Sequence, residues 1–162
     1  MVDSTLGLTR VRALAIVRYR EVRGPAPSEL DLPGIGQSKI VNGLECLWRS
    51  PSVWWVKSRT QKASEIIAWL ARPDFAIDYS DAVATFLLTG ALARRALSAG
   101  CPVDLRPHAF PAGSVAATRF DLFDIVLHAR SDETFDVHVA RSYAEDAARR
   151  LGDAVASLQC SN

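Results

Sequence analysis

Two histidines in the last third of the chain are the residues with the clearest potential for metal chemistry. His128 and His138 flank a short turn, and Asp124 and Asp136 lie close to them in sequence. Imidazole and carboxylate groups bind zinc, but a zinc site needs three or four such ligands that converge. A tight turn at residues 131–133 gives a register in which side-chain alternation points the two histidines to opposite faces of a sheet. We therefore expect surface or half-buried histidines and no metal site.

Cys101 is a second candidate for chemistry, as a nucleophile. It follows the C-terminal end of a predicted short helix, where the helix dipole disfavours a thiolate, and the nearest histidine, His108, lies beyond two prolines. The other cysteines are Cys46 and Cys160, and none forms a C-x-x-C pair. This spacing argues against a zinc site or a disulfide framework and favours a reducing compartment. We expect Cys101 to be a small buried hydrophobe and the chain to be cytoplasmic.

Cofactor loops and large charged fields are not evident in the sequence. Gly34 and Gly36 follow a Pro-rich loop rather than a strand, and the third glycine of a dinucleotide fingerprint is missing. The net charge of +1 gives no field for nucleic acid, and the longest uncharged stretch, residues 82–93, is too short to span a bilayer. We expect no catalytic, cofactor-binding or metal residues in this chain, and neither nucleic acid nor a membrane as a partner.

Three tryptophans, Trp48, Trp54 and Trp55, cluster on one predicted hairpin. Alternation sends Trp54 and Trp55 to opposite faces, so one of them points away from the domain's own core. One reading is a second packing surface inside the fold; the other is a partner interface, because aromatic residues dominate interface hot spots. The same two readings hold for the pairs Arg94-Arg95 and Arg149-Arg150, for which solvated helix faces are the default expectation.

The elements that carry these residues follow one plan twice. Residues 52–70 and 133–151 each begin with a β-type run and continue into a helix with apolar residues at i, i+3, i+4 and i+7. The first helical face comprises Ala63, Ile66, Ile67 and Leu70, and the second comprises Ala144, Ala147, Ala148 and Leu151. Ser142 and Glu145 have the spacing of a capping box at the start of the second helix.

Further strands complete each half, and the second half has one further helix, which a loop replaces in the first half. A helix is expected from residues 89–90 to about 98, with Gly100 at its C′ position, and a Pro/Gly-rich loop at residues 25–36. The expected strands span residues 10–20, 38–41, 44–48, 53–56, 75–79, 84–88, 113–120, 122–129 and 134–139. These elements predict one α+β domain over residues 1–162, with duplicated ββαβββα subdomains at about 8–72 and 73–158. Antiparallel sheets with packed helices are expected, because short turns join most strands.

Several motifs resemble the gamma subunits of heterotetrameric sarcosine oxidase. Residues 100–114, GCPVDLRPHAFPAGS, resemble the G-C-P-x-D-L-x-x-x-x-F-x-x-G-S segment of that family. Residues 141–145, RSYAE, are similar to the start of its last helix, and Asp78 to Asp81 are similar to its D-x-S strand. Leu47-Trp48, Pro51 and Trp54 match an L-W-x-x-P-x-x-W hairpin. The resemblance covers roughly residues 44–155.

The resemblance implies the fold of the tetrahydrofolate-binding aminomethyltransferase domain and a structural, non-catalytic role in a complex that demethylates sarcosine or a related N-methyl amine. It implies a large alpha-type subunit and a flavin-bearing beta-type subunit as partners, with a small delta-type subunit as a further one. FAD, FMN, NAD and tetrahydrofolate are then cofactors of those partners. The alternative is a stand-alone folate-binding or aminomethyl-transferring enzyme. Such enzymes carry an aspartate pair where this chain has Asn42-Gly43, and nearby Glu45 is expected to be a solvated strand residue.

Overall fold

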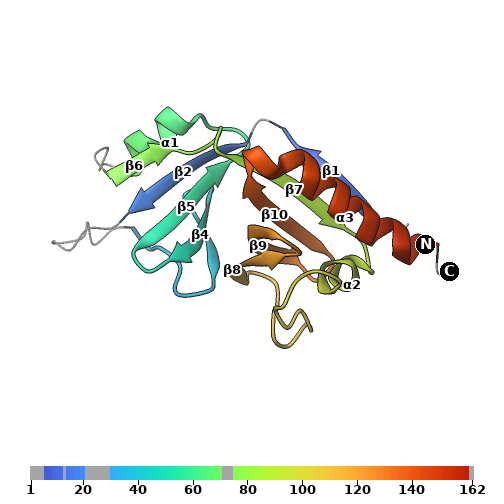
Figure 1. Ribbon diagram of the computed structural model, residues 1–162. Coiled ribbons are helices and arrows are strands. Elements are labelled where there is room, and N and C mark those ends of the chain that lie inside the picture. Colours follow the sequence, from blue (N-terminus) through green and yellow to red (C-terminus); the bar gives the residue numbers. More distant parts are fainter. Residues whose placement is uncertain (1–5, 13, 21–29, 71–74, 161–162) are drawn as a thin grey trace. The chain divides into compact units, whose positions relative to one another are not determined.

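The computed structural model describes residues 6–12, 14–20, 30–70 and 75–160. The chain divides into two compact units, each containing an antiparallel five-stranded sheet in its described residues (Figure 1). Residues 13–82 form one unit, which we call the N-terminal unit. Residues 83–162 together with residues 1–12 form the other, which we call the C-terminal unit. The predicted α+β class with antiparallel sheets is confirmed.

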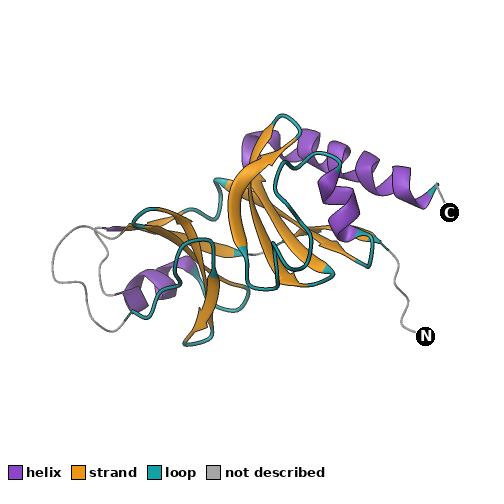
Figure 2. Cartoon of the chain, turned by 90° about the horizontal axis from the view of Figure 1, so that it is seen from below, coloured by secondary structure: helices purple, strands orange, loops and turns teal. Residues whose placement is uncertain are grey.

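The sheet of the C-terminal unit has one apolar face, which is covered by two helices. Its strand order is β1 (Gly7–Val11), β7 (Val83–Thr89), β10 (Thr134–Ala140), β9 (Phe123–Ser131) and β8 (Val115–Phe120). Helices α2 (Ala93–Ser98) and α3 (Ala144–Gln159) contact each other and bury their apolar faces in the same core (Figure 2). Phe86, Phe135 and Leu127 of the sheet are at most 2% exposed in that core.

The sheet of the N-terminal unit carries a smaller core under a single described helix. Its strand order is β3 (Ser38–Val41), β4 (Leu44–Ser50), β5 (Val53–Ser58), β2 (Ala15–Arg20) and β6 (Ala76–Asp78). Helix α1 (Ala63–Leu70) buries Ile66 and Leu70 against Val17 and Val56 of the sheet. The apolar spacing that predicted this helix therefore marks the face that enters the core.

The sequence has two halves, one from β1 to α1 and one from β6 to α3, and both follow the same order of strands and end in a helix. The first strand of each half pairs in the sheet formed by the other half. β1 precedes β2 in sequence, yet it pairs with β7 at the edge of the C-terminal unit's sheet. β6 precedes β7, yet it pairs with β2 at the edge of the other sheet. Apart from this exchange, each half continues through a three-stranded meander, β3-β4-β5 or β8-β9-β10, into a helix. The exchanged edge strands therefore link the two similar halves of the sequence.

One long strand over residues 10–20 was predicted, and this prediction is wrong. Two strands, β1 and β2, occupy the segment and pair in different sheets. The apolar alternation continues across the break, so the local pattern does not reveal where the chain leaves one sheet for the other. Ala13 and much of the predicted loop at residues 25–36 lie outside the described residues. The other predicted strands are present with small shifts at their ends, and no helix among the described residues is long and apolar enough to cross a membrane.

The predicted capping box at Ser142 and Glu145 is also wrong. A 3₁₀ turn, η2 (Arg141–Tyr143), precedes α3, and neither element has a side-chain cap. Glu145 instead pairs with Arg10 of β1, with Nη1 2.6 Å from Oε1. The tertiary ion pair thus replaces the local bond that the sequence spacing suggested.

Gly100 occupies the predicted C′ position after α2. A left-handed backbone conformation does not explain why glycine stands at this position. Ala99 caps the helix, and Gly100 has no positive φ. A Cβ atom at position 100 would lie 3.0 Å from the Phe120 ring and 3.1 Å from the backbone nitrogen of Asp121. The close approach of β8 to the end of the helix therefore requires glycine here.

Candidate functional site: the tryptophan hairpin and the buried polar face

The tryptophan hairpin consists of β4 and β5 joined by Pro51 and Ser52. Trp48 lies directly opposite Trp54, so both indoles are on the side of the sheet that carries the core. The register shifts between Trp48 and Ser50, which makes Arg49 an inserted bulge residue. The predicted separation of the neighbouring tryptophans follows: Trp54 is on the core side and Trp55 is on the opposite side.

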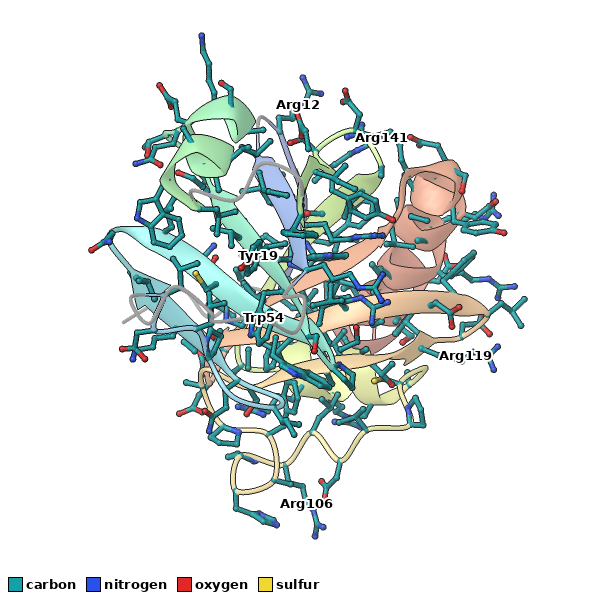
Figure 3. All side chains as sticks on the ribbon, turned by 90° about the vertical axis from the view of Figure 1, so that its left-hand side faces the viewer. Arg12, Tyr19, Trp54, Arg106, Arg119 and Arg141 are labelled. Carbon is teal, nitrogen blue, oxygen red and sulfur yellow. The ribbon has the colours of Figure 1, made fainter. Side chains whose placement is uncertain are left out.

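Trp54 is half-buried and held by its own chain. Its Nε1 donates a hydrogen bond to the Pro33 carbonyl oxygen at 2.9 Å. Its ring lies 6.4 Å from that of Tyr19, its partner across β2 and β5 (Figure 3). Trp48 beside it is also half-buried. On this side of the hairpin, Trp54 is held in place by its hydrogen bond and by Tyr19, and both Trp48 and Trp54 keep part of their indole surface accessible.

Trp55 is 6% exposed. Its ring lies 5.9 Å from the Tyr79 ring, and the Arg49 guanidinium lies 5.8 Å from its centre. Whether any of the three tryptophans contacts a partner stays a prediction. The structure makes Trp48 and Trp54 the better candidates for such a contact, because their indoles are partly accessible and that of Trp55 is almost fully buried.

The two histidines lie on the same face of the C-terminal unit's sheet, so the prediction of opposite faces is wrong. The strands β9 and β10 meet at residues 131 and 134, and a bulge at Arg130 then shifts the register by one residue. As a result Asp136 lies opposite His128, and His138 is two residues farther along the same face. A shift of one residue is enough to move a side chain to the other face of a sheet.

These groups form a buried polar row on the face opposite the helices. His128, Asp136 and His138 are each at most 2% exposed. His138 Nδ1 lies 2.7 Å from the Thr85 hydroxyl, and His128 Nδ1 lies 3.7 Å from Asp136 Oδ2. The Asp136 carboxylate thus lies beside the His128 imidazole within this buried row. The histidines are therefore buried, which corrects the expectation of surface or half-buried positions.

Cys101 is 7% exposed, as predicted for a small buried hydrophobe. Its Sγ lies 3.9 Å from the Thr118 hydroxyl, and all three cysteines are free. Cys46 is fully buried, and burial, reinforced by the neighbouring Glu45, raises the pKa of its thiol to about 12. A thiol with so high a pKa is a poor nucleophile at neutral pH.

The loop that carries the Gly-Cys-Pro motif is held in place by Arg94. Nη1 of Arg94 donates hydrogen bonds to the carbonyl oxygens of Leu105 at 2.7 Å and Phe110 at 2.9 Å. Its Nε bonds the Asp132 carbonyl oxygen and its Nη2 the Asp132 carboxylate. Leu105 and Phe110 are buried in the core. The expectation of a solvated Arg94 is thus wrong, because these bonds leave its side chain only 14% exposed.

At the tip of the same loop, Arg106 binds Asp104 through Nε at 2.9 Å (Figure 3). The hydrogen bond from the Arg106 side chain holds the pKa of the Asp104 carboxyl below its usual range. Both residues are exposed in this motif, whereas Leu105 between them enters the core. Within this motif, the buried Leu105 anchors the loop in the core, and Asp104 and Arg106 on either side of it lie at the surface.

Asn42 and Gly43 form the two-residue turn between β3 and β4. Their φ angles are 50° and 78°, the combination of a hairpin turn for which Asn-Gly is the preferred sequence. Glu45 is not a solvated residue as expected: its Oε2 lies 2.9 Å from Nζ of Lys57, which is 2% exposed. The turn geometry thus accounts for Asn42-Gly43, and the nearby carboxylate is committed to an ion pair.

Comparisons with known proteins give a match at the level of the fold. No family model and no curated protein match the sequence. Among solved structures, the chain is similar to a chain of the heterotetrameric sarcosine oxidase from Corynebacterium sp. U-96, solved in complex with pyrrole 2-carboxylate. The TM-score is 0.84 at 19% identity, covering 97% of this chain and 87% of that chain. The chain therefore has the fold of a subunit of that complex.

Proposed function

We propose that this chain is a gamma-type accessory subunit of a flavin-dependent, sarcosine oxidase-like complex. The observation that carries the proposal is the mutual coverage of the fold match, 97% of this chain and 87% of the other. A match of this extent describes a whole subunit rather than a shared module. The motifs at residues 47–54, 78–81, 100–114 and 141–145 support the same subunit independently of the fold.

In this proposal the chain has a structural role in the complex, and the partner subunits carry out the catalysis. A large alpha-type subunit holds NAD and tetrahydrofolate, and a beta-type subunit holds the flavins FAD and FMN. The complex oxidises the N-methyl group of sarcosine or a related secondary amine and passes the one-carbon unit to the folate. The turn at Asn42-Gly43 supports this division, because neither residue supplies the carboxylate of a folate enzyme.

The proposed contact surface includes the half-buried side of the tryptophan hairpin. Stable complexes bury on the order of 2,000 Å² or more and centre on aromatic anchors. Trp48 and Trp54 supply two adjacent indoles on one side of the sheet. Because Nε1 of Trp54 already bonds Pro33, a partner gains a preorganised surface with little loss of side-chain entropy.

Affinity capture of the full chain from its native host tests the proposal. The expected result is co-purification of a large flavoprotein, recognised by its flavin absorbance, together with N-methyl amine oxidation in the captured material. Capture of the chain alone in a folded state, under conditions that preserve multi-subunit enzymes, would contradict it.

A titration of the isolated chain with tetrahydrofolate separates the alternative. The accessory role predicts no saturable binding and no aminomethyl transfer by the chain alone. Saturable folate binding by the single chain would favour the stand-alone enzyme instead.

A further inference from the structure

A pocket on the N-terminal unit is lined by three arginines that the proposed function does not use. It has a volume of about 390 Å³ and lies on the side of the sheet opposite the core. Arg18 and Arg20 reach it from β2, and Arg49 reaches it from the end of β4. The rings of Trp55 and Tyr79 are also part of its wall.

The strand register explains why these side chains meet. Arg18 lies directly opposite Trp55, so both project from the same face, and Arg20 follows two residues after Arg18 on that face. Arg49 is the bulge residue of the hairpin, and bulges redirect side chains at the edges of sites. Its guanidinium comes to lie 5.8 Å from the centre of the Trp55 ring.

Two of the guanidinium groups are positioned by aromatic rings. Arg49 lies over Trp55, and Arg18 lies 5.8 Å from the centre of the Tyr79 ring. The two rings contact each other at 5.9 Å and so form one aromatic wall. A guanidinium held against a ring keeps its N–H groups free at its edge, where they can bind a planar or tetrahedral anion through two parallel hydrogen bonds.

Among the described residues, no carboxylate forms an ion pair with an arginine of the pocket. Among the ion pairs found in the described ranges, those of arginine involve Arg10, Arg94, Arg106, Arg130, Arg149 and Arg150. None of these pairs includes Arg18, Arg20 or Arg49. The whole chain has a net charge of only +1, so three cationic groups around one pocket are a local concentration. Like charges repel, and a bound anion relieves that repulsion.

We propose that this pocket binds an oxyanion, the carboxylate or phosphate group of a small molecule. Its volume is within the range of small-molecule sites, and the aromatic wall accepts an apolar part next to the charged group. Arg18 and Arg49 bind the oxyanion through charge-assisted hydrogen bonds, and Arg20, which is exposed, attracts it to the entrance. This site is independent of the tryptophan pair on the core side of the hairpin.

Titration of the isolated full chain with inorganic phosphate, and separately with benzoate, tests the site. Quenching or enhancement of tryptophan fluorescence is the readout, because Trp55 is part of the pocket wall. We expect saturable binding of at least one probe with a Kd of about 1 mM or tighter, weakened by added salt. Saturation with phosphate alone identifies a phosphate site, and saturation with benzoate alone identifies a carboxylate site.

Substitutions establish that the arginines are responsible. Arg18→Gln and Arg49→Gln are each expected to weaken binding about tenfold or more, because each removes charge-assisted hydrogen bonds. Arg59→Gln is the matched control: it removes an exposed arginine of the same unit outside the pocket and should leave Kd unchanged. The proposal is overturned if neither probe saturates the folded chain, or if Arg59→Gln weakens binding as much as the pocket variants. Circular dichroism of each variant confirms the folded state.

Discussion

The Arg94 guanidinium lies 5.0 Å from the centre of the Phe135 ring. This contact places a helical arginine of α2 over strand β10, where its N–H groups reach the loop at residues 105–110 and the turn at Asp132. One side chain thereby ties together a helix, a strand, a loop and a turn of the same unit. Lysine cannot replace it, since an ammonium lacks the planar array of donors.

Arg94→Lys is therefore expected to lower the free energy of unfolding by about 2 kcal/mol or more, because hydrogen bonds from charged donors contribute roughly 1.5–3 kcal/mol. Urea denaturation of the purified chain measures the change. The neighbouring Arg95 is exposed, so Arg95→Lys should change the free energy by less than about 0.5 kcal/mol. Equal effects of the two substitutions would contradict the structural role of Arg94.

The tryptophans of the hairpin should separate into two classes. Trp48→Ala and Trp54→Ala are expected to weaken assembly with the oxidase partners by about 2 kcal/mol, as for aromatic anchors, while the chain still folds. Trp55→Ala should mainly destabilise the chain, by roughly 3–5 kcal/mol, because a buried indole is removed. Pull-down of partners and thermal melts of each variant measure the two effects.

Trp69 on α1 provides the matched control for the hairpin. It is half-buried in the same unit but lies outside the hairpin, so Trp69→Ala should leave partner capture unchanged. If the folded hairpin variants capture partners as well as Trp69→Ala does, the hairpin is internal packing and the contact surface lies elsewhere.

Two glycines should respond to alanine with opposite signs. At Gly100 the added methyl group would press on the Phe120 ring and on the backbone of Asp121, so Gly100→Ala should destabilise the chain by about 1–3 kcal/mol. At Gly152, inside α3, a Cβ atom meets nothing within 4 Å, so Gly152→Ala should stabilise the chain by about 0.5–1 kcal/mol. Thermal melts give both signs, and destabilisation at both positions would refute the packing argument for Gly100.

The buried thiol of Cys46 should make stability depend on alkaline pH. Its pKa is raised from 9.0 to about 12, so in this range the folded chain keeps a proton that the unfolded chain loses. The corresponding stability is fully present below pH 9 and is lost between about pH 9 and 12, by about 1.4 kcal/mol per pH unit at most. Unfolding free energies of wild type and Cys46→Ala, measured across this range, should converge as pH rises. Parallel curves would contradict the raised pKa.

The predictable parts of this fold are those encoded by local patterns. The faces of α1 and α3 follow from 3.6-residue periodicity, and the predicted bounds of β3, residues 38–41, match the observed ones. Non-local choices were not predictable in the same way. Residues 10–20 keep one apolar alternation while the chain changes sheets. The break is decided only by the pairing partners, which for β1 lie between 74 residues away (Val11 with Thr85) and 82 residues away (Gly7 with Thr89).

The candidate sites show the same division. The opposite orientation of Trp54 and Trp55 needs only strand alternation, and it is confirmed. The placement of His128 depended on a single bulge residue, Arg130, that no local pattern marks. Arg94 was mistaken for a solvated residue because its acceptors are backbone carbonyls of a loop, and their position depends on how Leu105 and Phe110 enter the core.

The exchange of β1 and β6 has a consequence for how such a chain can arise. A single half, expressed alone, would have its first strand without a sheet and its sheet without an edge strand. Two identical copies of that half could satisfy both needs by trading first strands, which is domain swapping between protomers. Joining the copies end to end would then convert a swapped dimer into one chain with no loss of pairing. A chain split at the junction between the halves should regain its structure only when both fragments are mixed, because each fragment carries the edge that the other lacks.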